Sequence, residues 1–148
     1  MYSNSDKRLC TILISLAVLL PLALPGTVSS QTLAGAPGSS SQWGSGWLDL
    51  APAVDFAKGE HLKLFVGGSA DKILVRLLPK GASPDTSTGI IPGVVNVPKS
   101  RIVVVTLPED RKQVVQISVH GGPNPWGKFP LGGGNGPATI ESAERVKP

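Results

Sequence analysis

The run of β-branched and apolar residues from Ile102 to Leu107 places the strongest constraint on what this chain can fold into. Side chains branched at Cβ are stiff and pack well on a pleated surface, so the run predicts a strand that is central or covered on both faces. Pro108 ends the run, because proline lacks the N–H group that pairs neighbouring strands. Residues 114–120 alternate between apolar and polar, which predicts a second strand with one face in the core. We therefore expect a β-hairpin whose turn is the charged segment 109–112.

Other short apolar or alternating segments, bounded by Gly, Pro, Ser and Asp, also predict strands: 47–50, 61–66, 73–78 and 94–97. Segments 61–66 and 73–78 are expected to pair as a hairpin, and 94–97 to lie at a sheet edge. Residues 138–146 fit a last strand or a short helix. The strand is favoured, because Thr139 and Ile140 are β-branched.

No segment shows a 3.6-residue apolar period, so the expected fold is all-β. We predict an antiparallel β-sandwich of about six to eight short strands. The layout resembles that of jelly-roll and galactose-binding-like accessory modules, but it matches no motif of those families residue by residue.

Residues 1–30 have the layout of a secretory signal peptide: basic residues, then the apolar segment 9–24, then small residues before Gln31. The alternative is an uncleaved membrane anchor. The apolar segment is shorter than the roughly 20 residues that a spanning helix needs, and it contains Pro21. We therefore expect a cleaved signal peptide and a secreted or periplasmic protein.

Residues 31–46 consist mainly of Gly, Ser, Ala and Pro, which is typical of a flexible tether. This places a single sandwich domain over residues 47–148. Trp43 would then lie in the tether, and Trp47 is expected to pack under the first strand.

The only cysteine, Cys10, lies in the predicted signal peptide, so the exported domain would contain neither a disulfide nor a thiolate metal site. The net charge is +4, but the basic residues are scattered among acidic ones. Proteins that bind nucleic acid usually carry a clustered basic patch, so nucleic acid is not an expected partner. A membrane would be contacted only through an uncleaved signal segment.

The segment from His120 to Pro123 follows an apolar strand and resembles the His-Gly-Gly oxyanion loop of α/β-hydrolases. That family also needs a Gly-x-Ser-x-Gly nucleophile turn and helical crossovers, and this sequence has neither. The alternative is that the glycines make a tight exit from the strand. We favour that alternative and assign no catalytic residue.

A metal site could use the two histidines, His61 and His120, with a carboxylate. No closely spaced pair of ligands supports it, so we expect both histidines to be strand residues facing solvent or a hydrogen-bonding partner. We predict no metal and no cofactor.

The loop after residue 120 is the best candidate for ligand contact. Trp126 lies between Pro125 and Gly127, where little local core is available. Exposed aromatic rings stack on the C–H faces of sugars while neighbouring polar groups bind hydroxyls. The candidate ligand-binding residues are therefore His120, Asn124, Trp126 and Asn135. The alternative, which we rate slightly higher for the tryptophan itself, is that Trp126 folds back and plugs the end of the sandwich.

Three functions follow from these features. The first is an exported, non-catalytic module that binds carbohydrate or another extracellular ligand. The second is a structural or assembly protein of the cell envelope that pairs with a partner through the edge near 94–97. The third is an enzyme, which would need a concave site with converging ionisable groups.

Overall fold

The computed structural model describes residues 27–83, 90–122 and 134–148. Within these ranges the chain forms nine strands and no helix. The strands are β1 (Ser29–Thr32), β2 (Gly35–Ser40), β3 (Ser45–Phe56), β4 (His61–Gly68), β5 (Lys72–Pro79), β6 (Ile90–Asn96), β7 (Ile102–Thr106), β8 (Arg111–His120) and β9 (Ala138–Lys147).

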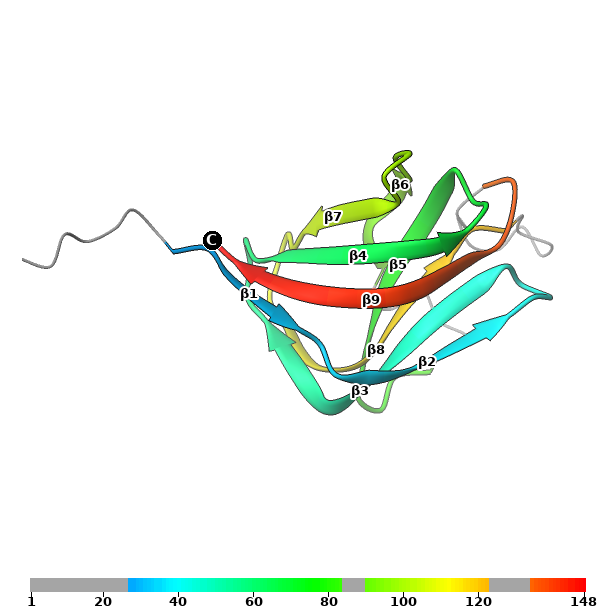
Figure 1. The fold of residues 1–148 in the computed structure, drawn as a ribbon. Coiled ribbons are helices and arrows are strands. Elements are labelled where there is room, and N and C mark those ends of the chain that lie inside the picture. Colours follow the sequence, from blue (N-terminus) through cyan, green and yellow to red (C-terminus); the bar gives the residue numbers. More distant parts are fainter. Residues whose placement is uncertain (1–26, 84–89, 123–133) are drawn as a thin grey trace, which may run out of the picture.

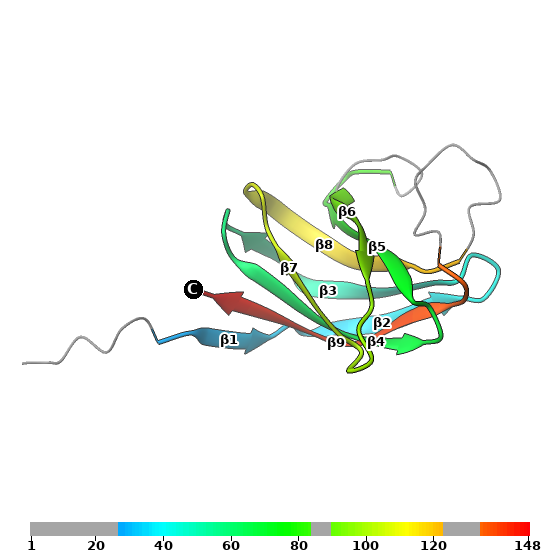
Figure 2. The ribbon, with the colours of Figure 1, turned by 90° about the horizontal axis from the view of Figure 1, so that it is seen from above.

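The strands form two antiparallel sheets that face each other (Figures 1 and 2). One has four strands in the order β1-β9-β4-β7, and the other has five in the order β2-β3-β8-β5-β6. The predicted all-β class is therefore confirmed. The strand count exceeds the predicted range, because β1 and β2 were not expected.

One apolar core lies between the sheets. In β4 every second residue points inward, and Leu62, Leu64 and Val66 are buried as their alternation predicted. The five-stranded sheet contributes residues of the same kind from β3, β5 and β8. The largest fully buried side chains in the core cluster are Phe56, Leu62, Leu64, Ile73, Leu77, Leu107 and Ile117.

The predicted hairpin of residues 101–120 is wrong, because its two strands belong to different sheets. Strand β7 pairs with β4, whereas β8 pairs with β3 and β5. After β7 the chain is held by the turn before β4: Leu107 N–H donates to Glu60 O, and Gly59 N–H donates to Leu107 O, both at 2.8 Å. With Leu107 buried, the charged segment that follows crosses between the sheets instead of folding back.

The predicted pairing of 61–66 with 73–78 is wrong for a similar reason. Strand β4 lies in one sheet and β5 in the other. Between them, the N–H groups of Ser69 and Ala70 both donate to Pro137 O, which directs the chain towards β9. Ala70 is completely buried there.

Strand β7 is neither central nor covered on both faces, contrary to the prediction. It is the edge of the four-stranded sheet, with Val103 and Val105 buried and Val104 58% exposed. The uniform run of β-branched residues therefore conceals an ordinary alternation. Strand β6, which covers most of the segment predicted for 94–97, does lie at an edge, and 138–146 does form a strand.

The tether predicted over 31–46 is wrong where the structure forms β1 and β2. Strand β2 pairs with the first half of β3, and β1 pairs with the end of β9. Between them, Leu33 is buried and its N–H donates to Ala143 O at 2.9 Å. Backbone pairing needs no large side chains, so a segment of Gly, Ala, Pro and Ser can serve as an edge strand once Leu33 anchors it. The folded unit therefore begins near Ser29 rather than at Trp47.

Candidate functional site

Two of the four predicted ligand-binding residues, Asn124 and Trp126, lie outside the described residues. The other two, His120 and Asn135, lie at the end of the molecule where β8 finishes and β9 begins. Their positions show how much of the predicted site the fold brings together.

His120 faces outward from the five-stranded sheet and is bound by two serines. Its Nδ1 lies 2.7 Å from Ser45 Oγ, and its Nε2 lies 3.4 Å from Ser118 Oγ. Burial and, secondarily, the positive charge of Arg76 lower the pKa of His120 to about 4. The imidazole is therefore neutral at physiological pH.

The hydrogen bonds of Ser45 indicate a structural role for this cluster. Its hydroxyl also lies 3.2 Å from Trp43 O, to which it donates. Its single proton is then engaged, so His120 Nδ1 donates to Ser45 Oγ. Because Ser45 and Ser118 are both buried, neither hydroxyl is presented to a substrate as a nucleophile.

Asn135 is exposed, and its polar groups face the connection between β4 and β5. Its backbone N–H donates to Asp71 Oδ1 at 3.3 Å. With its amide oriented to satisfy its neighbours, the side-chain nitrogen donates to Ser69 O and to Asp71 Oδ1. This amide therefore closes a turn.

The chain segments that carry His120 and Asn135 approach each other through neighbouring glycines, while the two side chains face different groups. Gly134 packs so closely that a Cβ there would overlap the carbonyl oxygens of Gly121 and Lys72. The imidazole of His120 contacts Ser45 and Ser118, whereas the amide of Asn135 contacts the β4–β5 connection. The fold thus joins the segments without converging the two polar groups on one point.

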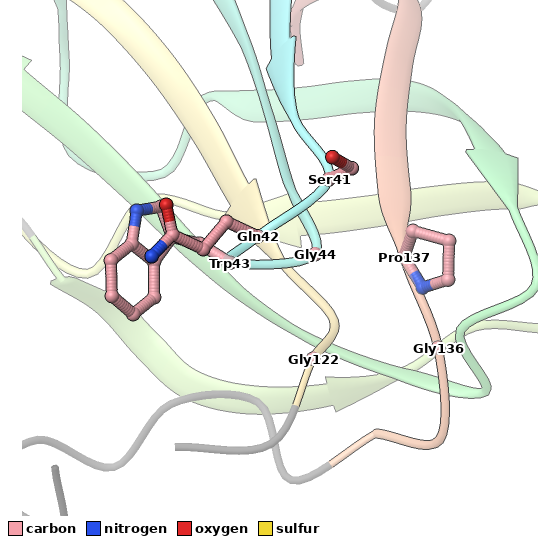
Figure 3. A pocket seen from close by; sticks show the side chains of 7 residues that line it. All are labelled: Ser41, Gln42, Trp43, Gly44, Gly122, Gly136 and Pro137. Carbon is pink, nitrogen blue, oxygen red and sulfur yellow. The ribbon is translucent and has the colours of Figure 1, made fainter. Parts of the chain in front are cut away.

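A shallow cleft of about 200 Å³ lies at the same end of the molecule (Figure 3). It lies where the β2–β3 turn meets the residues that follow β8 and precede β9. Gly44 is at this junction, and its carbonyl accepts the N–H groups of Gly121 and Ala138. The lining residues are Ser41, Gln42, Trp43, Gly44, Gly122, Gly136 and Pro137.

In the His-Gly-Gly segment, one backbone donor that an oxyanion loop would use is already engaged. The Gly121 N–H already donates to Gly44 O at 3.0 Å. A Cβ at Gly122 would lie 2.9 Å from Trp43 O, which explains why glycine is needed at this exit from β8. This geometry agrees with a tight strand exit.

The two histidines lie on outer faces of different sheets, so they cannot share a metal ion. His61 Nδ1 lies 2.9 Å from Thr106 Oγ1 on the four-stranded sheet, whereas His120 is on the five-stranded sheet. Across the described ranges, no three His, Cys, Asp or Glu side chains gather closely enough to hold a metal ion.

Sequence reasoning misplaced Trp47. Its neighbours Leu48 and Leu50 are buried in the core, so the alternation of β3 directs Trp47 outward, onto the face that also carries Asp49. The indole is partly exposed and lies across Gly38 of β2. The alternation of residues 47–50 was the signal that could have placed it.

No protein-family model, curated protein or solved structure matches this chain. In the described ranges there is no helix long and apolar enough to cross a membrane.

Proposed function

We propose that this chain is an exported, non-catalytic binding module for carbohydrate or another extracellular ligand. The proposal includes removal of the predicted signal peptide by cleavage before Ser29, which leaves β1 intact, and a jelly-roll-like arrangement of the two sheets. The cleft at the end of the sandwich is the observation that carries it. Three chain segments meet there, and the glycines Gly44, Gly122 and Gly136 line the cleft with backbone atoms. Trp43 adds an indole, Gln42 an amide and Ser41 a hydroxyl.

These groups are of the kind that hold sugars. Aromatic rings cover apolar C–H faces, and amides and hydroxyls exchange hydrogen bonds with sugar hydroxyls. Chain connectivity also supports the proposal, because Gly122 of the cleft directly precedes the sequence segment that contains Asn124 and Trp126.

A polysaccharide-binding assay tests this function. The full chain, expressed with its own N-terminal segment, is incubated with a panel of insoluble and soluble polysaccharides, and retention is measured. We expect wild-type retention that Trp43→Ala or Trp126→Ala weakens while the melting temperature stays unchanged. Val104→Ala is the matched control, because Val104 is an exposed side chain of the four-stranded sheet that does not line the cleft. Absence of retention on every polysaccharide would refute the glycan form of the proposal.

The second candidate is an envelope assembly protein, and the sheet edges favour it. Strand β7 is an edge strand of five β-branched residues, and its Val104 is 58% exposed, while Val94 of the other edge strand, β6, is 47% exposed. Such edges can pair with a strand of another chain. Light scattering of the purified protein tests this candidate, which predicts an oligomer that Val104→Lys dissociates.

A further inference from the structure

The outer face of the five-stranded sheet carries a second group of side chains suited to a ligand, on the strands β2, β3 and β8. Trp47 lies between Gly38 and Ser118, and Asp49 lies between Ala36 and Gln116, in adjacent outward-facing rows. Because residues two apart on a strand share a face, these rows form one surface. We refer to Trp47, Asp49 and Gln116 as the sheet-face group.

Trp47 is held in place by the strand beneath it. A Cβ at residue 38 would overlap Nε1 and Cε2 of the indole, so glycine is what allows the ring to lie across β2. The indole is partly exposed. Among the described residues nothing accepts a hydrogen bond from its N–H, and that nitrogen is not fully buried. The ring therefore offers an ordered apolar surface and an available donor.

Asp49 and Gln116 form a polar pair next to the ring. Gln116 Nε2 donates to Asp49 Oδ1 at 2.8 Å, which fixes both side chains before any ligand arrives. The exposed carboxylate keeps a further acceptor oxygen, and the amide keeps its carbonyl oxygen. On the β2 side of the pair, Ala36 is too small to cover these groups.

We propose that the sheet-face group binds a neutral polysaccharide chain, with one pyranose ring stacked on Trp47 and its hydroxyls bonded to Asp49 and Gln116. This inference rests on the proposed binding function and assigns it a site separate from the end cleft. The carboxylate of Asp49 disfavours acidic sugars, because like charges repel. The ring over Gly38 and the polar pair beside Ala36 lie next to each other on β2 and β3, which suits adjacent units of an extended chain.

The experiment compares variants of the full chain by depletion onto microcrystalline cellulose and by affinity electrophoresis in soluble glucomannan. We expect Trp47→Ala to weaken binding about tenfold or more, as for a central aromatic contact. Trp47→Phe keeps an aromatic surface and should retain most of the binding. Gln116→Ala should weaken binding about threefold, and it removes no core contact. Phe65→Ala alters a partly exposed aromatic on the outer face of the other sheet and should bind like the wild type.

The outcomes separate this inference from the proposed function. If the wild type binds and both Trp47→Ala and Gln116→Ala bind equally well, the sheet-face site is wrong and the binding function stands. If the wild type binds neither polysaccharide, the sheet-face site is wrong, and the full panel then decides the binding function.

Tighter binding to carboxymethyl cellulose than to glucomannan would overturn the preference for neutral sugars. If Trp47→Ala unfolds, as judged by its thermal melt, Gln116→Ala alone decides the case. Loss of self-association in Trp47→Ala, with binding retained, would mark this face as a contact between copies of the chain and overturn the inference.

Discussion

Arg145 binds both carboxylate oxygens of Glu60, with Nε 2.8 Å from Oε2 and Nη2 2.9 Å from Oε1. The pair joins β9 to the turn before β4, and Glu60 is only 6% exposed. Glu60 also accepts the Ala57 N–H at 3.1 Å, and the Arg145 guanidinium lies 5.6 Å from the centre of the Phe56 ring. One buried carboxylate thus fixes the end of β3, the following turn and the last strand.

Substituting Glu60 should therefore destabilise the protein. Glu60→Gln removes the charge that pairs with Arg145 and leaves the guanidinium partly buried, which should lower the free energy of unfolding by about 2–4 kcal/mol. Urea unfolding followed by tryptophan fluorescence measures it. Glu109→Gln is the matched control, because Glu109 pairs with Arg111 but its side chain is 65% exposed, so its loss should cost less than about 1 kcal/mol. Equal effects from the two variants would contradict a special role for Glu60.

The buried imidazole of His120 should make stability depend on pH. Its pKa is about 4 in the folded chain, below the ordinary value of 6.5. The unfolded chain therefore takes up a proton first, and stability falls as the pH drops from about 6.5 towards 4. The loss attributable to His120 is at most about 3 kcal/mol. Urea unfolding at pH 7 and pH 4.5 should show a smaller pH difference in His120→Asn than in the wild type, and an unchanged difference would refute the assignment.

Glu60 should extend this acid sensitivity to lower pH. Burial raises its pKa, but the bonds from Arg145 and from the Ala57 N–H outweigh burial, and the net pKa lies below the ordinary 4.5. A carboxylate with a lowered pKa contributes stability above its unfolded value, and this contribution is lost as the pH falls through the folded value. Below about pH 4.5, the free energy of unfolding should therefore fall less with decreasing pH in the Glu60→Gln variant than in the wild type. Urea unfolding at several pH values below about 4.5 measures this difference.

Arg101 should resist replacement by lysine. Its guanidinium donates to three backbone carbonyls, from Nε to Val66 O at 3.0 Å, from Nη1 to Ala70 O at 2.7 Å and from Nη2 to Gly67 O at 3.0 Å. An ammonium group cannot reproduce this planar fork, so Arg101→Lys should lower the free energy of unfolding by about 2–3 kcal/mol. Lys99→Arg, an exposed exchange of the same charge type, should have little effect. Chemical denaturation of both variants gives the comparison.

Gly46 should tolerate no side chain. It lies on β3 where β9 approaches, and a Cβ there would lie 2.5 Å from Thr139 Cα and 2.8 Å from Ala138 O. These are backbone atoms that no side-chain rotation can relieve, so Gly46→Ala should lower the melting temperature by several degrees. Ser39, its exposed partner on β2, provides the control, and Ser39→Ala should leave the melt unchanged.

Much of the fold could be predicted from local pattern, because side-chain alternation and proline positions act within one strand. The inward faces of β4 and the strand character of β9 followed from such signals. The assignment of strands to sheets did not. Whether β7 pairs with β4 or with β8 depends on where Leu107 is buried, and on its backbone hydrogen bonds to Gly59 and Glu60, about fifty residues away in sequence.

The candidate site was less accessible to sequence reasoning. The segment 35–40 was interpreted by composition alone, so the strand beside Trp47 was missed, and with it the surface on which that indole lies. His120 was expected to face solvent or a hydrogen-bonding partner, and its two serine partners agree with the latter. Ser45 and His120 are 75 residues apart, which no local pattern could reveal.

The pairing of β1 with β9 has a consequence for how the chain acquires its structure. Among the nine described strands, only β2–β3 and β5–β6 join strands that are neighbours in sequence, and the other pairings join strands further apart in the chain. The loops between such strands must close before their contacts stabilise anything, which slows folding to the range of milliseconds to seconds. The four-stranded sheet also cannot be completed until residues 138–147 have left the ribosome, so β1 and β4 lack their shared neighbour β9 while the preceding chain is being synthesised.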